Sequence, residues 1–359
     1  SLRNGVYDIT FHFVEPQGAA PGERIFDVLV QGSKRIEDLD ISRIRGSRAP
    51  SALNRTVTGV IVDDGQLDIR LVSGRSEPVL SGLVVRERLA RDAGWDLAWA
   101  DEFDYRGKPD PDRWNIQKWA PGQVNREAQA YTDHERNVRV DGDHLILEAH
   151  REDSGEAPYT SGRIHSRGKG DFLHGRVDIR ARLPRGQGTW AAIWMLPSDP
   201  FRYATTCDQQ VEWQGNDDCD AWPNSGEIDI MEHVGYDMNL VHGTVHNHSF
   251  FGGGPKHFNG SVEARDVDKD FHVYSLEWTP ERIDIFIDGS CYYSYVNDGA
   301  GWETWPYDHP FHLVLNLAIG GNWGEAGGPI DNDIFPVSMH VDYVRVFKPV
   351  ESSLVQESE

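Results

Sequence analysis

The sequence predicts an all-β protein built from β-sandwiches, and three observations support this. Helical periodicity is hard to find anywhere in the 359 residues. Short runs that alternate apolar and polar residues recur instead, separated about every 8–15 residues by Gly, Pro, Asn or Asp. In residues 176–183 (RVDIRARL) the alternation is nearly complete, which predicts a strand with one buried and one solvated face, as in antiparallel sheets.

The alternating runs predict nine strands. Each is short, has the period of two that a half-buried strand requires, and is bounded by turn-forming residues. In chain order they are residues 6–14, 25–30, 67–72, 145–149, 175–183, 228–231, 283–287, 311–317 and 340–347.

A domain boundary is predicted near the charged run at residues 86–94 (RERLARDAG). Trp is absent from residues 1–94, and all 12 tryptophans lie between Trp95 and Trp323. We therefore predict a small β-sandwich segment at 1–85, a linker at 86–94, a larger domain at 95–349 and an acidic tail at 350–359.

The charge balance excludes several function classes. Lys and Arg number 35 against 58 Asp and Glu, giving a net charge of −23. Binding to nucleic acid or to anionic lipid needs a basic surface, so neither is expected. No run approaches the roughly 18 apolar residues of a membrane span. We expect a monomer without a nucleic-acid or membrane partner.

The chain has three cysteines. Cys207 and Cys219 lie 12 residues apart in a polar stretch, and a disulfide between them would close a small surface loop in a secreted protein. The alternative is three reduced thiols, since Cys291 stands alone in a strand-like run. We expect a secreted or extracellular protein, or one in the periplasm or at the cell surface.

The densest chemical signal is residues 225–232 (SGEIDIME). In a strand, Glu227 and Asp229 point to one face, and regular alternation would turn Glu232 to the other. One extra residue, a β-bulge around 230–231, would return Glu232 to the face of the first two acids. Three clustered carboxyl groups resist joint ionisation, so at least one pKa would be raised.

This cluster suits glycoside hydrolysis. A retaining mechanism needs an ionised carboxylate as nucleophile and a protonated carboxyl as acid, about 5–5.5 Å apart. The alternative is an exposed acidic strand face, common in so acidic a chain. The surroundings favour catalysis, because sugars stack on aromatic rings and tryptophans flank the motif. Trp190 and Trp194 would share one strand face.

Residues 95–347 resemble the catalytic domain of glycoside hydrolase family 16, in its laminarinase-like (endo-1,3-β-glucanase) branch. The resemblance runs through the whole segment, with its motifs in the family's order. They are WADEFD (99–104), NREAQAYT (125–132), YTSGR (159–163), GTWAAIWMLP (188–197), GEIDIME (226–232), HGTVH (242–246), NLAIGGNWG (316–324) and VDYVRVF (341–347).

The resemblance implies a β-jelly-roll with a concave substrate cleft and a retaining endo-hydrolase of 1,3-β-glucan, needing no cofactor for catalysis. Glu227 would be the nucleophile, Asp229 its helper and Glu232 the general acid/base. The substrate would be a β-glucan polysaccharide or oligosaccharide. Residues expected to line the cleft are Asn125, Arg163, Trp190, Trp194, Trp213, His246 and Trp323.

Family members often carry a structural calcium on the convex face. By the resemblance, its ligands here would be Glu102, Gly142 through its carbonyl, and Asp342. Oxygen ligands of this kind suit a hard cation. The chain departs from compact members between Pro197 and Trp222, where residues 203–220 are expected to form a loop at the cleft rim.

The N-terminal segment resembles the middle and later strands of a malectin-like carbohydrate-binding domain. The residues that carry the resemblance are 4–13 (NGVYDITFHF), 24–32 (RIFDVLVQG) and 38–41 (DLDI). The first part of that pattern is absent. A sandwich that merely packs against the catalytic domain is therefore an equal alternative to a sugar-binding module.

Other functions stay open at this point. A catalytically inactive glucan-recognition protein on the same fold would lose one or both acids, whereas all three are intact here. Hydrolysis of mixed-linkage glucan, agarose or carrageenan is the nearest enzymatic alternative. A zinc site at His242, His246 and His248 is a weak further candidate, because 15 histidines make chance clusters common.

Overall fold

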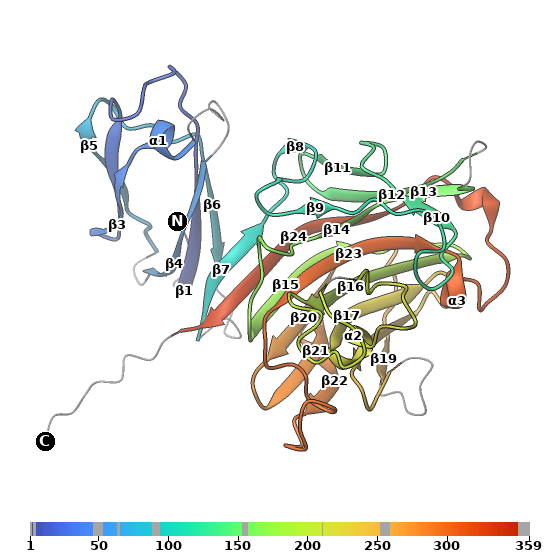
Figure 1. Ribbon diagram of the computed structural model, residues 1–359. Helices are drawn as coiled ribbons and strands as arrows, with labels where there is room; N and C mark the ends of the chain where they lie inside the picture. The colour runs from blue at the N-terminus through green and yellow to red at the C-terminus, as the bar shows by residue number, and fades with distance from the viewer. Residues whose placement is uncertain are drawn as a thin grey trace, which may run out of the picture. The chain divides into compact units, whose positions relative to one another are not determined.

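In a computed structural model, the chain is almost entirely β and divides into two compact units, residues 1–96 with 350–359 and residues 97–349 (Figure 1). The structure describes residues 2, 5–45, 53–62, 65–87, 94–152, 157–209, 211–251 and 259–350. Most of the predicted linker and all but the first residue of the predicted tail lie outside this part. None of the described helices is long and apolar enough to cross a membrane.

The N-terminal unit is a sandwich of two three-stranded sheets with strand orders β4-β1-β6 and β3-β2-β5. Its strands alternate as predicted: in β2 every second side chain is buried. The core between the sheets includes Phe11, Phe13, Phe26 and Val28. The elements are β1 (Gly5–Phe13), β2 (Ile25–Val30), β3 (Ser33–Leu39), α1 (Ile41–Arg45), β4 (Leu53–Val62), β5 (Ile69–Arg75) and β6 (Gly82–Glu87).

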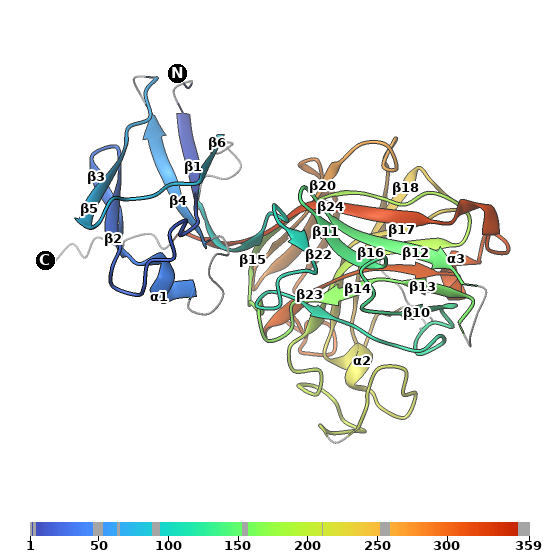
Figure 2. The same ribbon diagram turned by 90° about the horizontal axis from the view of Figure 1, so that it is seen from above.

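The C-terminal unit has two larger sheets around one extensive apolar core (Figure 2). The 11-stranded sheet follows the path β10-β13-β12-β24-β15-β20-β21-β22, with β7, β8 and β11 attached to it. Its strands are β7 (Trp95–Asp101), β8 (Arg106–Gly107), β10 (Gln129–Tyr131), β11 (Val138–Asp141), β12 (Leu145–Arg151), β13 (Tyr159–Ser161), β15 (Gly175–Arg182), β20 (His272–Trp278), β21 (Arg282–Ile287), β22 (Ser290–Val296) and β24 (Val337–Pro349).

The seven-stranded sheet carries the acidic motif and has the order β19-β18-β17-β16-β23-β14-β9. All neighbouring strands in it are antiparallel. Its elements, with the short helices beside it, are β9 (Asn115–Ile116), β14 (Arg163–His165), β16 (Thr189–Pro197), α2 (Ala221–Asn224), β17 (Glu227–Val234), β18 (Leu240–His246), β19 (Asn259–Glu263), β23 (Phe311–Ile319), α3 (Gly321–Gly324) and the 3-10 turn η3 (Asn332–Ile334).

Strand β15 differs from its prediction on one face. Val177 and Ile179 are fully buried as expected, but Arg176 and Asp178 on the predicted solvated face are buried too. They pair with each other, Arg176 Nε donating to Asp178 Oδ1 at 3.1 Å, and the ring of Phe347 packs on the guanidinium. Charges can be buried in this way because each has a partner.

Candidate active site

Strand β17 contains the β-bulge that the acidic motif predicts. On the β18 side, Asp229 pairs with Thr244 and Glu232 pairs with His242, so three steps along β17 match two along β18. On the β16 side, Asp229 faces Trp194 and Glu232 faces Ala192, again two apart. The extra residue therefore returns Glu232 to the face that carries Glu227 and Asp229.

The bulge places two consecutive side chains, Ile230 and Met231, in the apolar core, where both are fully buried. The hydroxyl of Tyr292 in β22 donates to the carbonyl of Ile230 at 2.8 Å. A bulge removes a residue from regular pairing, so an outside donor is needed for its carbonyl. The acids are thus fixed from behind by packing and by this hydrogen bond.

Each carboxylate of the motif has a partner in the cleft. Trp222 Nε1 donates to Glu227 Oε2 at 2.9 Å, and Trp190 Nε1 donates to Glu232 Oε1 at 3.1 Å. His246 Nε2 lies 3.0 Å from Asp229 Oδ2 and 3.7 Å from Glu227 Oε1. Indole N–H groups are donors only, so they favour an acceptor oxygen in a fixed position.

Burial raises the pKa of all three acids. For Glu227 the neighbouring Asp229 raises it further, and for Asp229 the charge of Glu232 does so. The pKa of Glu232 is raised by burial, although His246 and the indole of Trp190 oppose the rise. Because the three groups interact, their protons belong to the cluster, which keeps at least one proton at a pH where an isolated Glu has lost it.

The floor beside the acids is aromatic. Trp194 Nε1 donates to Asn316 Oδ1 at 2.7 Å, which fixes its ring. The ring of Trp190 meets that of Trp323 edge to face at 5.7 Å. Trp323 comes from α3, after a backbone turn at Gly320 and Gly321 with positive φ. The predicted cleft residues Trp190, Trp194 and Trp323 therefore lie on one side of the sheet with the acids.

Arg163 lies between two indoles. Its guanidinium carbon is 4.4 Å from the ring centre of Trp119 and 4.9 Å from that of Trp194. The side chain is only 4% exposed, and among the described residues no ion pair to a carboxylate is recorded for it. Burial lowers the pKa of Arg163, and the nearby charges of Glu127 and Glu227 oppose this fall.

Comparison with known proteins agrees with this geometry. The family model for glycosyl hydrolases family 16 matches residues 124–345, which is more than half of the chain. The chain belongs to glycosyl hydrolase family 16. The predicted family, fold class and enzyme class, a glycoside hydrolase, are thereby confirmed.

Individual relatives support the assignment to family 16. A β-glucanase of Rhodothermus marinus is 45% identical over 263 residues, covering 72% of this chain and 86% of the relative. The X-ray structure of the laminarinase from Rhodothermus marinus matches with a TM-score of 0.64 at 45% identity, over 72% of this chain and 98% of that one. The laminarinase catalytic domain from Thermotoga maritima MSB8 matches with a TM-score of 0.61 at 35% identity, over 71% and 99%.

Several residues of the family 16 site were not singled out from the sequence. Trp222 and Trp119 are not among the predicted cleft residues. Tyr131 and Glu127 belong to the matched stretch 125–132, yet only Asn125 was selected from it. Tyr131 donates to Glu127 at 3.1 Å and accepts from Asn316 at 3.1 Å. The resemblance of that stretch to the family motif is the sequence feature that could have identified both residues.

Two further predicted cleft residues, Asn125 and Trp213, come from loops and not from the strands of the sheet. Asn125 is exposed, and its backbone carbonyl accepts a hydrogen bond from Asn322 N at 2.9 Å, so it supports the turn before Trp323. Trp213 lies in the loop of residues 203–220 and lines a separate pocket of about 700 Å³. The predicted disulfide in this loop is confirmed: Cys207 is bonded to Cys219, and Cys291 is free and exposed.

The three histidines of the zinc alternative are not gathered at one point. His246 contacts Asp229, whereas His242 packs edge to face on Trp323 at 4.9 Å. His248 Nδ1 lies 3.0 Å from Asn224 Oδ1. In the described part of the chain, the group whose ligand atoms converge within 4.8 Å is Glu227, Asp229 and His246, which is the acidic site itself.

The predicted calcium ligands are engaged by arginines. Both oxygens of Glu102 accept hydrogen bonds from Arg345, at 2.8 and 2.9 Å. Asp342 accepts from Arg180 at 2.6 Å, and Gly142 packs against another guanidinium. A calcium site requires several oxygens that face one point without competing cations. The side chains of Glu102 and Asp342 are therefore paired with arginines in this structure, and calcium binding stays a prediction.

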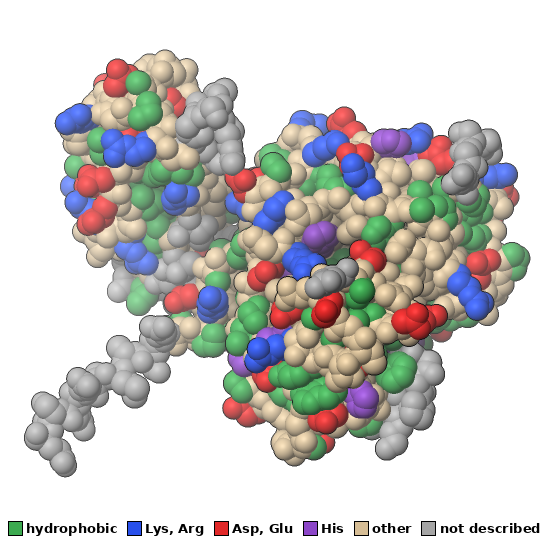
Figure 3. Space-filling model, viewed as in Figure 1, with side chains coloured by type: hydrophobic (Ala, Val, Ile, Leu, Met, Phe, Trp, Pro, Cys, Tyr) green, Lys and Arg blue, Asp and Glu red, His purple; other side chains and the backbone are tan. Residues whose placement is uncertain are grey.

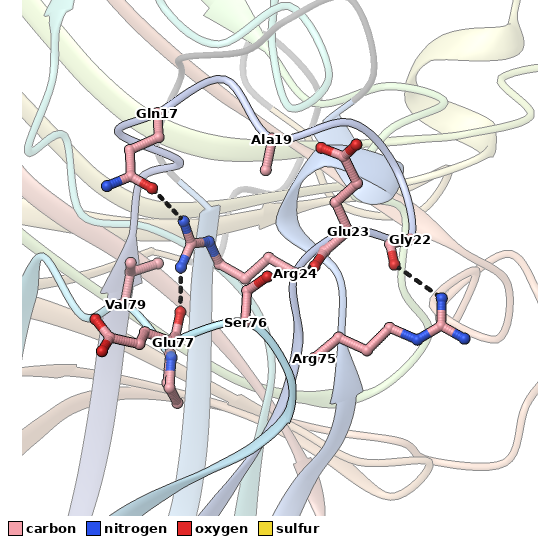
Figure 4. A pocket seen from close by; sticks show the side chains of 10 residues that line it. Gln17, Ala19, Gly22, Glu23, Arg24, Arg75, Ser76, Glu77 and Val79 are labelled. Carbon is pink, nitrogen blue, oxygen red and sulfur yellow. Dashed lines mark hydrogen bonds between the residues drawn. The ribbon is translucent and has the colours of Figure 1, made fainter.

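The N-terminal unit has a pocket of its own, of about 800 Å³ (Figure 4). The malectin domain model matches residues 1–82, in agreement with the predicted resemblance. Arg24 lies in the pocket and is held by Glu15, by Gln17 Oε1 at 3.1 Å and by the carbonyl of Glu77. None of the described residues that line this pocket is aromatic, so it lacks a stacking face for a sugar ring.

Proposed function

We propose that the chain is a retaining endo-hydrolase of 1,3-β-glucan. The observation that carries the proposal is the bulged strand β17, which presents three carboxyl groups on one face, beside tryptophans, in a family 16 domain. The space-filling view shows this side of the domain hollowed near its centre (Figure 3).

In the first step, Glu227 is the nucleophile and Glu232 the acid. A carboxylate oxygen of Glu227 forms a bond to the anomeric carbon while the glycosidic C–O bond breaks and its electron pair stays on the leaving oxygen. Glu232 gives its proton to that oxygen. The raised pKa of Glu232 supports this role, because an acid must hold its proton near neutral pH.

In the second step, Glu232 is the base. It removes a proton from a water molecule whose oxygen attacks the anomeric carbon, and the bond to Glu227 breaks. Asp229 stays a positioning residue between the two glutamates. Its buried carboxyl group shares the proton load of the cluster and holds His246 beside Glu227. The two inversions together retain the anomeric configuration.

The substrate assignment is supported by the relatives, which are named β-glucanase and laminarinase. A neutral glucan also suits an acidic protein, because its binding brings no charge repulsion. Release of reducing sugar from laminarin tests the activity, and parallel assays on curdlan, lichenan and agarose test the linkage. NMR of the first product tests the stereochemistry. An initial α-anomer would contradict retention.

A non-catalytic glucan-binding protein is the alternative from a different class. The intact Glu227, Asp229 and Glu232 argue against it, because clustered acids with raised pKa values are costly to a binding protein and are typical of catalytic sites. If the chain bound laminarin and released no reducing sugar, the alternative would hold.

Location and assembly complete the proposal. The Cys207–Cys219 disulfide supports a secreted, periplasmic or cell-surface enzyme, because disulfides persist in oxidising compartments. We further propose that it acts as a monomer, which sedimentation at several protein concentrations would test.

A further inference from the structure

The pocket of about 700 Å³ beside Trp213 is walled by four segments of the family 16 domain that are distant in sequence. Trp119 follows β9, Arg167 follows β14, and Ser198 follows β16. The fourth wall is the loop of residues 203–220, here called the disulfide loop, which supplies Trp213 and Gln214. The pocket thus offers two indoles together with amide, hydroxyl and guanidinium groups, which is a lining suited to a sugar.

The disulfide loop is fixed at its base. The Cys207–Cys219 bond closes it, and Asp220 accepts hydrogen bonds from the backbone N–H groups of Thr205 and Thr206 at 2.8 and 2.9 Å. Burial would raise the pKa of Asp220, but these hydrogen bonds outweigh it and lower the pKa to about 2. The base of the loop therefore keeps its charge and its bonds throughout the neutral and mildly acidic range.

The tip of the same loop contacts Gln123, in the segment that follows Trp119. Gln123 Nε2 donates to the carbonyl of Gln214 at 3.2 Å. Next to it, Gly215 has a φ of 76° and lies so close to the carbonyl of Gln123 that a Cβ would be 2.1 Å from it. Only glycine allows this approach. Trp213 therefore belongs to a loop that is held at both its base and its tip.

The pocket connects to the catalytic site through a short stack of side chains. Trp119, which lines the pocket, stacks on Arg163, and Arg163 stacks on Trp194. Trp194 pairs across the sheet with Asp229. Farther along β16, Ser198 accepts from Arg167 at 3.0 and 3.2 Å, which links the far ends of β14 and β16 at the pocket.

From these contacts we infer that the disulfide loop and Trp119 form a distal subsite for the β-glucan. It binds glucosyl units several positions from the cleaved bond, with Trp213 and Trp119 as the ring-binding faces. The inference rests on the proposed function and makes the disulfide loop the determinant of the chain-length preference.

The disulfide has a defined part in this subsite. Ordering a flexible loop on ligand binding costs conformational entropy, and a loop already held in place avoids that cost. Binding energy gained far from the cleaved bond then raises kcat/KM only for substrates long enough to reach the pocket.

Laminari-oligosaccharides of increasing length, from the trisaccharide to the octasaccharide, test the subsite. In the unchanged enzyme, kcat/KM should rise with length until the pocket is filled. Trp213→Ala should lower kcat/KM about tenfold for the longest substrates and leave the trisaccharide unchanged, because truncating a buried aromatic anchor removes more than 1 kcal/mol of binding. Trp213→Phe, which keeps a ring, should recover most of the loss.

The role of the disulfide is tested by the double variant Cys207→Ser/Cys219→Ser, with Cys291→Ser at the free cysteine as the matched control. The double variant should lose activity on long substrates only, and the control should behave as the parent. An equal change at all lengths, or none at any length in Trp213→Ala, would overturn the subsite. Absence of hydrolysis in the parent chain would instead overturn the proposed function, so the two failures are distinguishable.

Discussion

At the scale of single residues, the two glutamates of the site are each oriented by a hydrogen-bond donor that lies outside the sequence motif. Trp222 reaches Glu227 from α2, and Trp190 reaches Glu232 from β16. The motif therefore supplies the reactive groups, and residues outside it supply their orientation. Three predictions follow from these contacts.

Glu227→Ser should abolish hydrolysis of laminarin, lowering kcat by at least about 10³-fold, because the variant lacks the carboxylate assigned to the covalent intermediate. Binding of laminarihexaose, measured by calorimetry, should be largely kept. Glu232→Gln should also lose activity through loss of the proton donor. Full activity of Glu227→Ser would remove the nucleophile assignment.

Trp222→Phe should lower kcat/KM about tenfold, because a hydrogen bond to a charged group contributes roughly 1.5–3 kcal/mol. An aromatic ring is kept, so the variant removes the 2.9 Å bond to Glu227 while retaining part of the packing. Trp302→Phe is the control, since Trp302 stacks on Tyr203 at 5.4 Å. Equal losses in the two variants would mean that the indole of Trp222 acts only through packing.

Asp229→Asn should raise the melting temperature at neutral pH by a few degrees while lowering kcat. The pKa of Asp229 is raised in the folded protein, so its ionisation destabilises the fold as pH rises above the unfolded value of about 3.9. The gain in melting temperature should be present at pH 8. It should vanish at pH 3, where Asp229 is protonated in both the folded and the unfolded protein. Asp143→Asn at an exposed position should show no gain.

At the scale of elements, the sequence predicted strands well because they alternate. Each of the nine predicted runs overlaps an observed strand. The period of two alone turns Glu232 away from Glu227, and the predicted bulge at residues 230–231 is the extra residue that returns it. The buried pair Arg176 and Asp178 could not be predicted, because its partner ring, Phe347, comes from another strand. The same holds for Trp119, whose contact with Arg163 depends on long-range packing. Trp222 reaches Glu227 across the bend between α2 and β17, which the alternation does not reveal.

Deletion of Met231 tests what the bulge does. The shortened strand would pair one to one with β16 and still alternate, so all three acids would keep facing the cleft. We expect a folded protein with measurable activity, destabilised by about 2–5 kcal/mol through loss of a buried side chain.

The matched control is deletion of Ile228, which turns Glu227 toward the core. This variant should lose activity entirely, and a comparison of the two by circular dichroism and laminarin assay separates folding from catalysis. Equal inactivity in two folded deletion variants would show that the bulge itself is required.

At the scale of the whole molecule, the chain joins an acidic family 16 domain to a second β unit with its own core. The net charge of −23 would repel a sulfated polysaccharide and is indifferent to a neutral one. The net charge thus discriminates between polysaccharides, even though the enzymes that cleave them share one fold.

The KM for laminarin should therefore change less than about twofold between low and high salt, because screening acts only on charged partners. Any cleavage of carrageenan should be weak and should improve as salt screens the repulsion. The measurement is initial rate against NaCl concentration on both substrates. A steep salt dependence with laminarin would mean that charged groups carry substrate binding.

The hydrogen bond from Tyr292 to the carbonyl of Ile230 has a practical consequence. Tyr292 follows Cys291, the exposed free thiol, in β22. A fluorophore attached to that thiol would sit one residue from the group that fixes the catalytic strand, on the opposite side of β22 from the bond itself. The chain therefore carries a natural labelling position one residue from a contact of the catalytic strand.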